Sequence, residues 1–521
     1  MQTKAPPPAA AAFFPLLSLF LILGVALRLW HVTHEPLWLD EAYSAFAADH
    51  DLSFLWRVVP LYETHPPFYY TLLHGWVEVF GDSLTALRAF GLLAGFATLP
   101  VMALAADAAG RWLGWPRARR RWLALAAVGF ACLSLAMIEM ARQVRPYPLM
   151  VLVYAAETGL LLRLGGRAAA GERPARRLLV AYFLLLEAML WLHNLGPLYG
   201  VALTLALALA LPWRRLARDD LAVLVTGHLL VAIAYLPGLM ILHDQSVGWR
   251  ASTWLHFALS PVLFDHVMTL YAVPGWTGLA ALVLAVAGLG AIGRTRWRLG
   301  AILLGLAVLP VVLAILISLT IAPVFVTRIM SPVAAPALLL MAIGAAGPVV
   351  RPLIGAGAAF VLGVSMLAAD IQTRALGPFQ DWYRAVAWLQ PRVAAGDAIY
   401  AYPNEGALPL RRALRDRGLA YPVRAIPVEV PALEVRHGQH PTGTRGVSTL
   451  PRFELEAIAR APATRAVPTI WLLRLGPETF DPGDLFLTAL HRDRRIVRHY
   501  RDGPIDIIGL ARRPDGARIR D

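Results

Sequence analysis

Eleven long apolar segments, separated by short polar loops, constrain the fold of this 521-residue chain more than any other feature. Each is long enough to cross about 30 Å of hydrocarbon as a helix. Because 58% of the residues are apolar, a single water-soluble core could not bury them. We therefore predict a polytopic α-helical membrane protein with about eleven transmembrane helices. The segments are 13–31, 84–106, 122–139, 149–164, 178–192, 195–212, 220–242, 273–293, 299–321, 329–346 and 353–369.

The basic residues of the chain are concentrated in every second loop. The net charge is +14, from 48 Lys and Arg against 34 Asp and Glu. Loops rich in Lys and Arg stay on the cytoplasmic side of a membrane, so this pattern predicts the topology and argues against nucleic acid as a partner. The clustered residues are Arg111, Arg117, Arg119, Arg120, Arg121, Arg167, Arg173, Arg176, Arg177, Arg214, Arg215, Arg218, Arg294, Arg296 and Arg298.

The intervening loops are then expected on the outer side, beginning with a first outer loop at 32–83. The alternation holds only if the apolar stretch 66–80 lies in the membrane interface instead of crossing the bilayer. The first segment ends without a small-residue cleavage site, which predicts a retained signal anchor. The single cysteine, Cys132, excludes a disulfide within the chain.

After about residue 370 the composition becomes polar and no spanning segment remains. A turn into a strand is expected at 396–400, a helix at 406–414 and strands at 469–475 and 505–510, with a loop at 436–450. The fold prediction is thus a membrane domain of residues 1–369 followed by a soluble extracytoplasmic α/β domain of residues 370–521.

The first outer loop contains the adjacent carboxylates Asp40 and Glu41. Neighbouring carboxylates on a helix point in different directions, so one can act on a substrate while the other orients a partner or helps to hold a cation. The alternative is a solvated helix start with acidic residues near its positive end. His65 ends the same loop, before two prolines and an aromatic run that includes Tyr69; the alternative there is a surface histidine.

Guanidinium groups suited to a lipid phosphate occur in later outer loops. Arg142 and Arg145 precede Tyr147, and Arg328 precedes a late segment. Arginine binds phosphate through a planar fork of donors, whereas the alternative is snorkelling at a helix end. His193 is a further outer-face candidate. Glu157 lies deep in a segment, where a charge is usually paired or functional.

Common nucleotide and metal motifs are missing from the chain. No P-loop, GxGxxG, HExxH or paired CxxC motif occurs, which argues against a nucleotide-driven pump, a Rossmann enzyme and a thiolate zinc site. The energy of a reaction must then come from the substrate. Because an enzyme working outside the cytoplasm has no pool of nucleotide sugars, a sugar would have to arrive activated on a lipid phosphate. No cofactor is indicated, and a divalent metal stays open, with Asp40 and Glu41 as the only clear ligands.

Together these motifs resemble the GT-C superfamily of membrane glycosyltransferases, in its bacterial branch related to protein O-mannosyltransferases and lipid A aminoarabinose transferases. The resemblance covers residues 13–369. It rests on the pair Asp40 and Glu41, the His-Pro-Pro-Phe-Tyr-Tyr run at 65–70, Leu87-Arg88, and Arg145-Pro146-Tyr147. One departure is Ile329 after Arg328, where the family often has tyrosine.

The resemblance implies an inverting transfer of a sugar from a polyprenyl-phosphate donor to a lipid, glycan or protein acceptor, at the outer (periplasmic) face of a bacterial inner membrane. Asp40 would be the catalytic carboxylate that activates the acceptor hydroxyl, with Glu41 supporting the geometry. The leaving lipid phosphate would be held by Arg142, Arg145 and Arg328. The residues expected to line the site are His65, Tyr69, Tyr147 and His193.

Two alternatives share the membrane architecture. A transporter or flippase of lipid-linked saccharides would show broken helices and charges at mid-membrane in both halves, whereas here the polar residues concentrate on the outer side. A ligase or polymerase of lipid-linked glycans would be expected to have a larger outer loop late in the membrane part than the moderate loop at 243–272.

Overall fold

The computed structural model describes residues 8–63, 65–251, 255, 257–271, 275–349, 352–433, 450–481 and 483–513. Contacts within the chain divide it into two compact units. The first unit consists of Met1–Val32, Arg88–His243 and Leu255–Ala375. The second consists of Thr33–Leu87, Asp244–Trp254 and Leu376–Asp521. The predicted boundary near residue 370 between a membrane domain and a soluble outer domain stays a prediction.

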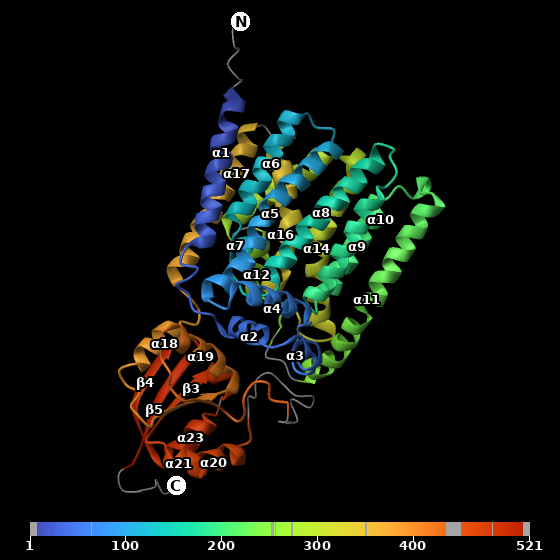
Figure 1. Cartoon of the computed structure of the whole chain (residues 1–521). Helices are drawn as coiled ribbons and strands as arrows, with labels where there is room; N and C mark the ends of the chain where they lie inside the picture. Colours follow the sequence, from blue (N-terminus) through green and yellow to red (C-terminus); the bar gives the residue numbers. More distant parts are fainter. Residues whose placement is uncertain are drawn as a thin grey trace. The chain divides into compact units, whose positions relative to one another are not determined.

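A bundle of helices forms the first unit, and α8, α9, α10 and α14 lie side by side within it (Figure 1). The long helices are α1 (Pro8–Leu29), α5 (Leu84–Trp112), α6 (Arg117–Leu133), α8 (Tyr147–Ala169), α9 (Arg176–Leu192), α10 (Gly196–Ala210), α11 (Arg218–Ala251), α13 (Trp276–Ile292), α14 (Trp297–Thr320), α16 (Ala334–Ala346) and α17 (Pro352–Leu376). Shorter pieces are α7 (Leu135–Ala141), η2 (Trp213–Arg215), α12 (Pro261–Tyr271), η3 (Arg294–Arg296), α15 (Thr327–Met330) and η4 (Ser331–Val333).

Each of the eleven segments predicted from the sequence contains a helix. Within the described residues, seven helices are long and apolar enough to cross a membrane, or eight if α6 and α7 form one bent span. Three others, α9, α10 and α13, have only 17, 15 and 17 residues. The break of 60° between α6 and α7 falls at Ser134, whose hydroxyl accepts a hydrogen bond from Met137 N–H. The predicted polytopic helical membrane fold is confirmed.

Small residues bring α13 and α16 into close contact. A Cβ on Gly344 would lie 2.0 Å from the carbonyl oxygen of Leu284, and one on Gly288 would lie 2.3 Å from that of Leu340. Both glycines are therefore required for the backbones to approach this closely, as is typical of helix pairs in membranes.

A sheet of five strands forms the C-terminal part of the second unit within the described residues. Its strands are β1 (Ala398–Tyr402), β2 (Val423–Ala425), β3 (Thr469–Leu475), β4 (Arg494–Asp502) and β5 (Ile505–Arg512), in the order β2-β1-β3-β5-β4. β1 is parallel to β2 and β3, with Tyr402 opposite Arg474, and β5 is antiparallel to β3 and β4. The helices of this part are α18 (Trp382–Leu389), η5 (Asn404–Gly406), α19 (Ala407–Asp416), α20 (Arg452–Arg460), α21 (Pro462–Ala466), α22 (Pro477–Phe480) and α23 (Leu485–His491).

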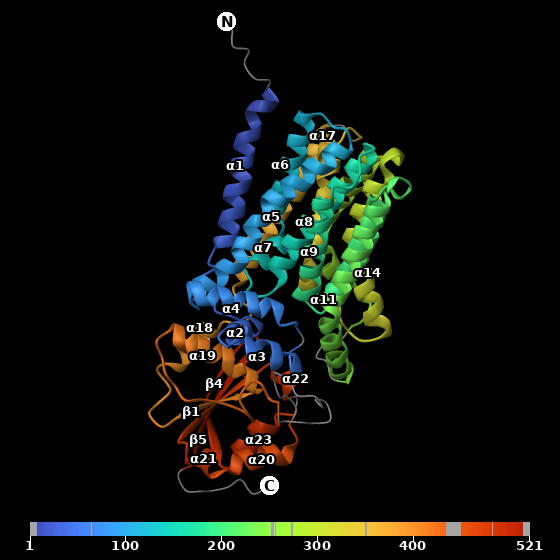
Figure 2. The same ribbon diagram turned by 45° about the vertical axis from the view of Figure 1, so that its right-hand side comes forward.

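Helices cover both faces of this sheet, with α18 and α19 on one side and α20, α21 and α23 on the other (Figure 2). Trp382 and Leu410 belong to the core on the first side, and Leu455 and Phe486 to the core on the second. Six of the seven residues of β3 are buried because the strand is covered on both faces. The predicted C-terminal α/β fold is confirmed, while the predicted loop at 436–450 lies almost wholly outside the described residues.

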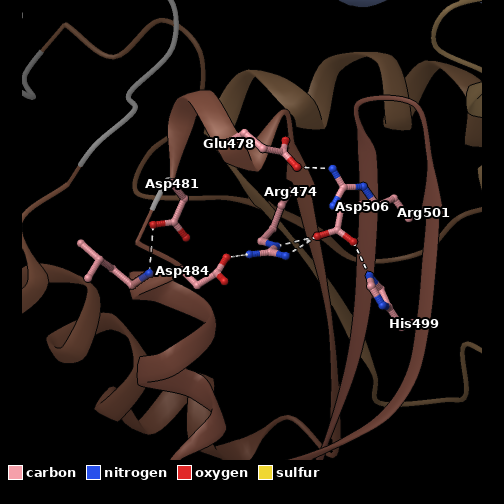
Figure 3. Close-up of polar contacts among 8 residues, drawn as sticks. Arg474, Glu478, Asp481, Asp484, His499, Arg501 and Asp506 are labelled. Atoms are coloured by element: carbon pink, nitrogen blue, oxygen red, sulfur yellow. Dashed lines mark hydrogen bonds and ion pairs between the residues drawn. The ribbon is translucent and has the colours of Figure 1, made fainter.

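A network of charged residues joins the ends of β3, β4 and β5. Figure 3 shows Arg474 between Asp484 and Asp506. Arg474 Nε donates to Asp506 Oδ2 at 2.8 Å, and His499 Nε2 shares a hydrogen bond with Asp506 Oδ1 at 2.5 Å. Asp506 is 1% exposed, so these partners compensate a buried charge and hold the strand ends together.

The remaining elements of the second unit are α2 (Leu39–Ala48), α3 (Leu52–Arg57), η1 (Val59–Leu61) and α4 (Phe68–Phe80). The apolar stretch 66–80 thus forms a helix of 13 residues, too short to be among the candidate spans. Its location in the membrane interface stays a prediction.

Candidate functional site

The first turn of α2 carries Asp40 and Glu41, and both side chains are buried. Asp40 is 8% exposed and Glu41 is 0% exposed. Glu41 Oε2 accepts a hydrogen bond from the backbone N–H of Trp38 at 3.3 Å, and the helix dipole favours negative charge at this end. Because successive helical residues are turned by roughly 100°, the two carboxylates leave the helix in different directions. Glu41 stabilises the start of the helix that carries Asp40.

His65 lies against Glu63, a carboxylate that is not among the residues predicted from the sequence. Its Nδ1 is 2.6 Å from Glu63 Oε1, and the residues are 9% and 2% exposed. Since a carboxylate can only accept, Nδ1 carries the proton of this hydrogen bond. The sequence signal was Glu63 two positions before His65. His65 is therefore an oriented, buried side chain, and the surface alternative is wrong.

Four tyrosines of the second unit contact one another in a chain of hydrogen-bonded and edge-on pairs. The hydroxyl of Tyr43 donates to that of Tyr62 at 2.8 Å. The ring of Tyr43 packs edge-on against Tyr70 at 5.7 Å between centroids, and Tyr70 packs against Tyr69 at 5.6 Å. Burial raises the pKa of the Tyr43 hydroxyl well above its ordinary value, and the Glu63 carboxylate raises it further. Tyr43 consequently stays protonated and acts as a hydrogen-bond donor.

In the first unit, Tyr147 is the centre of a cluster that joins four of the predicted residues. Arg328 Nε donates to its hydroxyl at 3.2 Å, and the Arg145 guanidinium lies over its ring at 5.9 Å. The ring of His193 lies 6.2 Å from that of Tyr147. We call Arg145, Tyr147, His193 and Arg328 the Tyr147 cluster. It places two guanidinium groups beside one phenol, an arrangement that favours an anion.

The histidine of this cluster has a defined tautomer. The backbone N–H of Leu195 donates to His193 Nδ1 at 3.0 Å. A ring nitrogen that accepts carries no proton, so the neutral ring presents its N–H at Nε2. His193 is 4% exposed, and it follows the last residue of α9. The cluster thus contains a buried imidazole donor in addition to its two cations.

Arg142, unlike Arg145 and Arg328, is hydrogen-bonded to backbone carbonyl oxygens at the end of α1. Its Nη1 donates to the carbonyl oxygens of Leu27 at 3.3 Å, Arg28 at 3.5 Å and Trp30 at 2.5 Å. These carbonyls end α1, where a cation is favoured by the helix dipole. Arg142 is 3% exposed. It therefore fixes the end of α1, and its predicted role in binding phosphate stays a prediction.

Close packing against α5 holds the backbone that carries these arginines. A Cβ on Gly91 would lie 2.8 Å from the carbonyl oxygen of Gln143, and one on Gly95 would lie 2.4 Å from the Cβ of Ala141. Arg88, on the same helix, donates through Nη1 to the carbonyl oxygen of Arg142. Glycine is thus needed at both positions for segment 141–143 to approach α5.

The carboxylates and the cations supply complementary chemistry. Asp40 and Glu63 can accept protons, whereas Arg145 and Arg328 can stabilise an oxyanion such as phosphate. Within the described ranges, no three or more His, Cys, Asp or Glu side chains are grouped so as to hold a metal ion. The chemistry that these residues can support is therefore proton abstraction from a hydroxyl and stabilisation of a leaving phosphate.

No protein-family model matches the chain, and no curated protein sequence matches it. Among solved structures, ArnT from Cupriavidus metallidurans in the apo state is 14% identical with a TM-score of 0.58, over 96% of this chain and 98% of that one. ArnT bound to undecaprenyl phosphate is also 14% identical, with a TM-score of 0.53 over 94% and 97% of the two chains.

A third solved structure is that of the Archaeoglobus fulgidus oligosaccharyltransferase tethered to an acceptor peptide. It is 12% identical with a TM-score of 0.49, over 96% of this chain and 74% of that one. At such identities the two ArnT structures show the fold. This chain has the GT-C fold, and the resemblance to that superfamily is confirmed at the level of fold.

Proposed function

We propose that the chain is an inverting glycosyltransferase that transfers a sugar from a polyprenyl phosphate to a lipid, glycan or protein acceptor. The observation that carries the proposal is the pair Asp40 and Glu41, buried together in the first turn of α2. A carboxylate pays a large desolvation cost when buried, and a function for Asp40 accounts for that cost. The GT-C fold supports the same reaction class.

In the proposed reaction, the acceptor hydroxyl loses its proton to the Asp40 carboxylate. The acceptor oxygen attacks the anomeric carbon of the donor from the face opposite the phosphate. A new carbon–oxygen bond forms, the bond to the phosphate oxygen breaks, and the electron pair leaves with the polyprenyl phosphate. General base assistance of this kind contributes roughly a hundredfold to ten-thousandfold.

The leaving phosphate is assigned to the Tyr147 cluster. Arg145 and Arg328 both contact the same phenol, and a forked guanidinium matches phosphate oxygens. Charge develops on that phosphate as the bond breaks, so preformed cations stabilise the transition state more than the ground state. The structure of ArnT bound to undecaprenyl phosphate supports a lipid-phosphate ligand for a protein of this fold.

We also assign the reaction to the outer, periplasmic side of a bacterial inner membrane, because the loops rich in arginine alternate with the loops that carry Asp40, Arg145 and Arg328. No nucleotide sugar is available on that side, so a lipid-linked mannose or another hexose or pentose is the donor class. The acceptor belongs to lipopolysaccharide, another glycan or a protein.

Glycosyl transfer from radiolabelled polyprenyl-phosphate sugars tests this proposal, in membranes with matched protein levels. We expect Asp40→Asn to reduce transfer about a hundredfold or more while still binding unglycosylated polyprenyl phosphate. The matched control is Asp51→Asn, since Asp51 is an exposed acid of the same loop whose Oδ1 caps α3 at Phe54 N–H, a role that Asn also fills. Transfer by Asp40→Asn at the wild-type rate would remove Asp40 from the mechanism.

A specific observation favours a transporter of lipid-linked saccharides as the second candidate. Glu157, at the middle of α8, is 0% exposed, and its oxygens have no hydrogen-bond partner within the described part of the chain. Buried carboxylates in membranes often relay protons, and α6 and α7 are sharply bent. Movement of labelled lipid-linked saccharide across vesicles without transfer, abolished by Glu157→Gln, would establish this alternative.

A further inference from the structure

At the start of the helix that carries Asp40, Glu41 accepts from the backbone N–H of Trp38, while the N–H of Leu39 takes its acceptor from the C-terminal part of the chain. The N-cap of this helix is Trp38, which makes no side-chain cap hydrogen bond, because an indole has no acceptor atom. The first backbone N–H groups of any helix need acceptors from elsewhere. For Leu39, the first residue of α2, that acceptor is Gln380 Oε1 at 3.0 Å, which lies 341 residues further along the chain.

Gln380 is itself held in place by the α/β part of the second unit. It is 6% exposed, and its Oε1 also accepts from Trp382 Nε1 at 3.2 Å. Trp382 is 0% exposed and belongs to the core between the sheet and α19. Both partners of Oε1 are donors, so only the oxygen of the amide can face them. The acceptor is thus held in place by a fully buried residue of that core.

The side chain of Leu39 packs against the same core, so α2 is attached by both its backbone and its first side chain. Helix α4 packs against α2. Just after the end of α4, Asp82 forms a second attachment to the C-terminal α/β part. Arg412 Nη2 donates to the carbonyl oxygen of Asp82 at 2.7 Å, and Arg415 Nη2 donates to Asp82 Oδ2 at 2.5 Å. The segment 33–87 is therefore anchored to the C-terminal α/β part at two points, at Gln380 and at α19.

We infer that Gln380 is a positioning residue, which supplies the acceptor for Leu39 N–H from the C-terminal α/β part and so helps to set the direction of the Asp40 carboxylate. The inference rests on the proposed role of Asp40. A catalytic group displaced by about 1 Å costs on the order of a hundredfold in rate, so the start of this helix requires a firm support. The α/β part is then a support for the catalytic turn.

The first test replaces the acceptor at residue 380. Gln380→Met keeps the size of the side chain but removes the acceptor, and we expect kcat to fall about tenfold while the KM of the donor stays within about twofold. Gln380→Glu restores an acceptor for both donors and should recover most of kcat. Gln390→Met is the matched control, since Gln390 is an exposed glutamine at the end of α18.

The second test removes the donor instead. Leu39→Pro deletes the N–H at the first helical position, where proline fits well, and Trp38 already has the extended backbone (φ −78°, ψ 174°) that precedes proline. Leu39→Ala keeps the N–H and isolates the loss of side-chain packing. We expect Leu39→Pro to lower kcat further than Leu39→Ala, and Gln380→Met to add little in the Leu39→Pro background.

Hydrogen exchange gives a readout that does not depend on activity. In the full-length protein, Gln380→Met should speed deuterium uptake by the peptide that contains Leu39, while the α3 peptide serves as the internal reference. Unchanged uptake and unchanged kcat would overturn the inference. If the wild type transfers no sugar from any donor, the proposed function fails. Faster deuterium uptake in Gln380→Met would then support the hydrogen bond between Gln380 and Leu39 but would remove the catalytic role inferred for it.

Discussion

The Nε–H of Arg328 donates a hydrogen bond to the Tyr147 hydroxyl at 3.2 Å, across 181 residues of sequence. Because this contact uses Nε, it orients the guanidinium plane, and a guanidinium in a fixed plane presents its donors to phosphate oxygens as a fork. Tyr147 also lies beneath the Arg145 guanidinium. One phenol thus orients both cations of the proposed donor site.

Replacing Tyr147 with phenylalanine should weaken donor binding. The hydroxyl that receives the Arg328 Nε–H is lost, and a hydrogen bond to a charged group is worth about 1.5–3 kcal/mol. We expect the KM of the polyprenyl-phosphate sugar to rise roughly tenfold or more, with normal expression. Tyr235→Phe is the control, because the Tyr235 hydroxyl has no hydrogen-bond partner in the described part of the chain. Equal donor KM in the wild type and Tyr147→Phe would contradict this role.

The Glu63 carboxylate should affect sugar transfer because it orients His65. The two side chains are buried 2.6 Å apart, so Glu63→Gln keeps the shape but loses the charge that orients the histidine. We expect sugar transfer to fall about tenfold, the lower end of the loss seen when the carboxylate that orients a metal-ligating histidine is replaced. Glu78→Gln, an exposed position on α4, should transfer normally. If His65→Ala lowers transfer as much in the Glu63→Gln background as in the wild type, the two residues act independently.

A methyl group at Gly344 should destabilise the helical bundle. Its Cβ would lie 2.0 Å from the Leu284 carbonyl oxygen, so α13 and α16 must move apart, at a cost of about 1–3 kcal/mol typical of overpacking. Gly305→Ala on α14 is the control, because nothing lies within 4 Å of the added Cβ. Thermal unfolding in detergent should show a lower Tm for Gly344→Ala only. A Tm equal to that of Gly305→Ala would argue against this close contact.

Stability should depend on pH through Asp481. Burial raises the pKa of its carboxyl group above the ordinary value of 3.8, so the folded chain binds this proton more tightly than the unfolded chain. The free energy of unfolding therefore falls as pH rises from the ordinary pKa through the raised pKa of Asp481. At neutral pH the carboxyl group is ionised in both states, and the full cost of burying its charge destabilises the folded chain. Asp481→Asn keeps an acceptor for Leu485 N–H, and we expect a higher Tm at neutral pH with a difference that vanishes on acidification.

Glu429 is the natural comparison for Asp481, because its shift has the opposite sign. The hydrogen-bonded Arg411 guanidinium lowers the pKa of the Glu429 carboxyl group, so its contribution is present above the ordinary pKa and is lost as pH falls. Glu429→Gln should lower the Tm at neutral pH and have less effect in acid. A Tm of Asp481→Asn below that of the wild type at neutral pH would refute the assignment for Asp481.

Burial on both faces explains which strands the sequence predicts. β3 was predicted at 469–475 with its observed bounds, because a strand covered on both sides is a continuous apolar run. β4 (Arg494–Asp502) was missed because it is an edge strand rich in arginine, with only one buried residue. The spanning helices were predictable for a similar reason, since length and apolar content alone define them.

Pairwise contacts of the candidate site could not be predicted in the same way. The rule that outward loops share one side of the membrane was enough to name Arg145, Tyr147, His193 and Arg328 together. It could not show that Tyr147 is the shared partner, because that contact depends on how α8 and α15 pack. Glu63 and Gln380 were missed since each acts through a neighbour, and neither residue type stands out in a polar stretch.

The cap of α2 by Gln380 also sets an order of events during synthesis. Leu39 leaves the ribosome 341 residues before its acceptor, which amounts to roughly 20 to 70 seconds at ordinary rates of translation. During that interval the start of α2 has neither its acceptor nor the core against which Leu39 packs. A chain whose membrane helices are already inserted would therefore lack a fixed catalytic turn until the C-terminal α/β part, about the last quarter of the sequence, has folded.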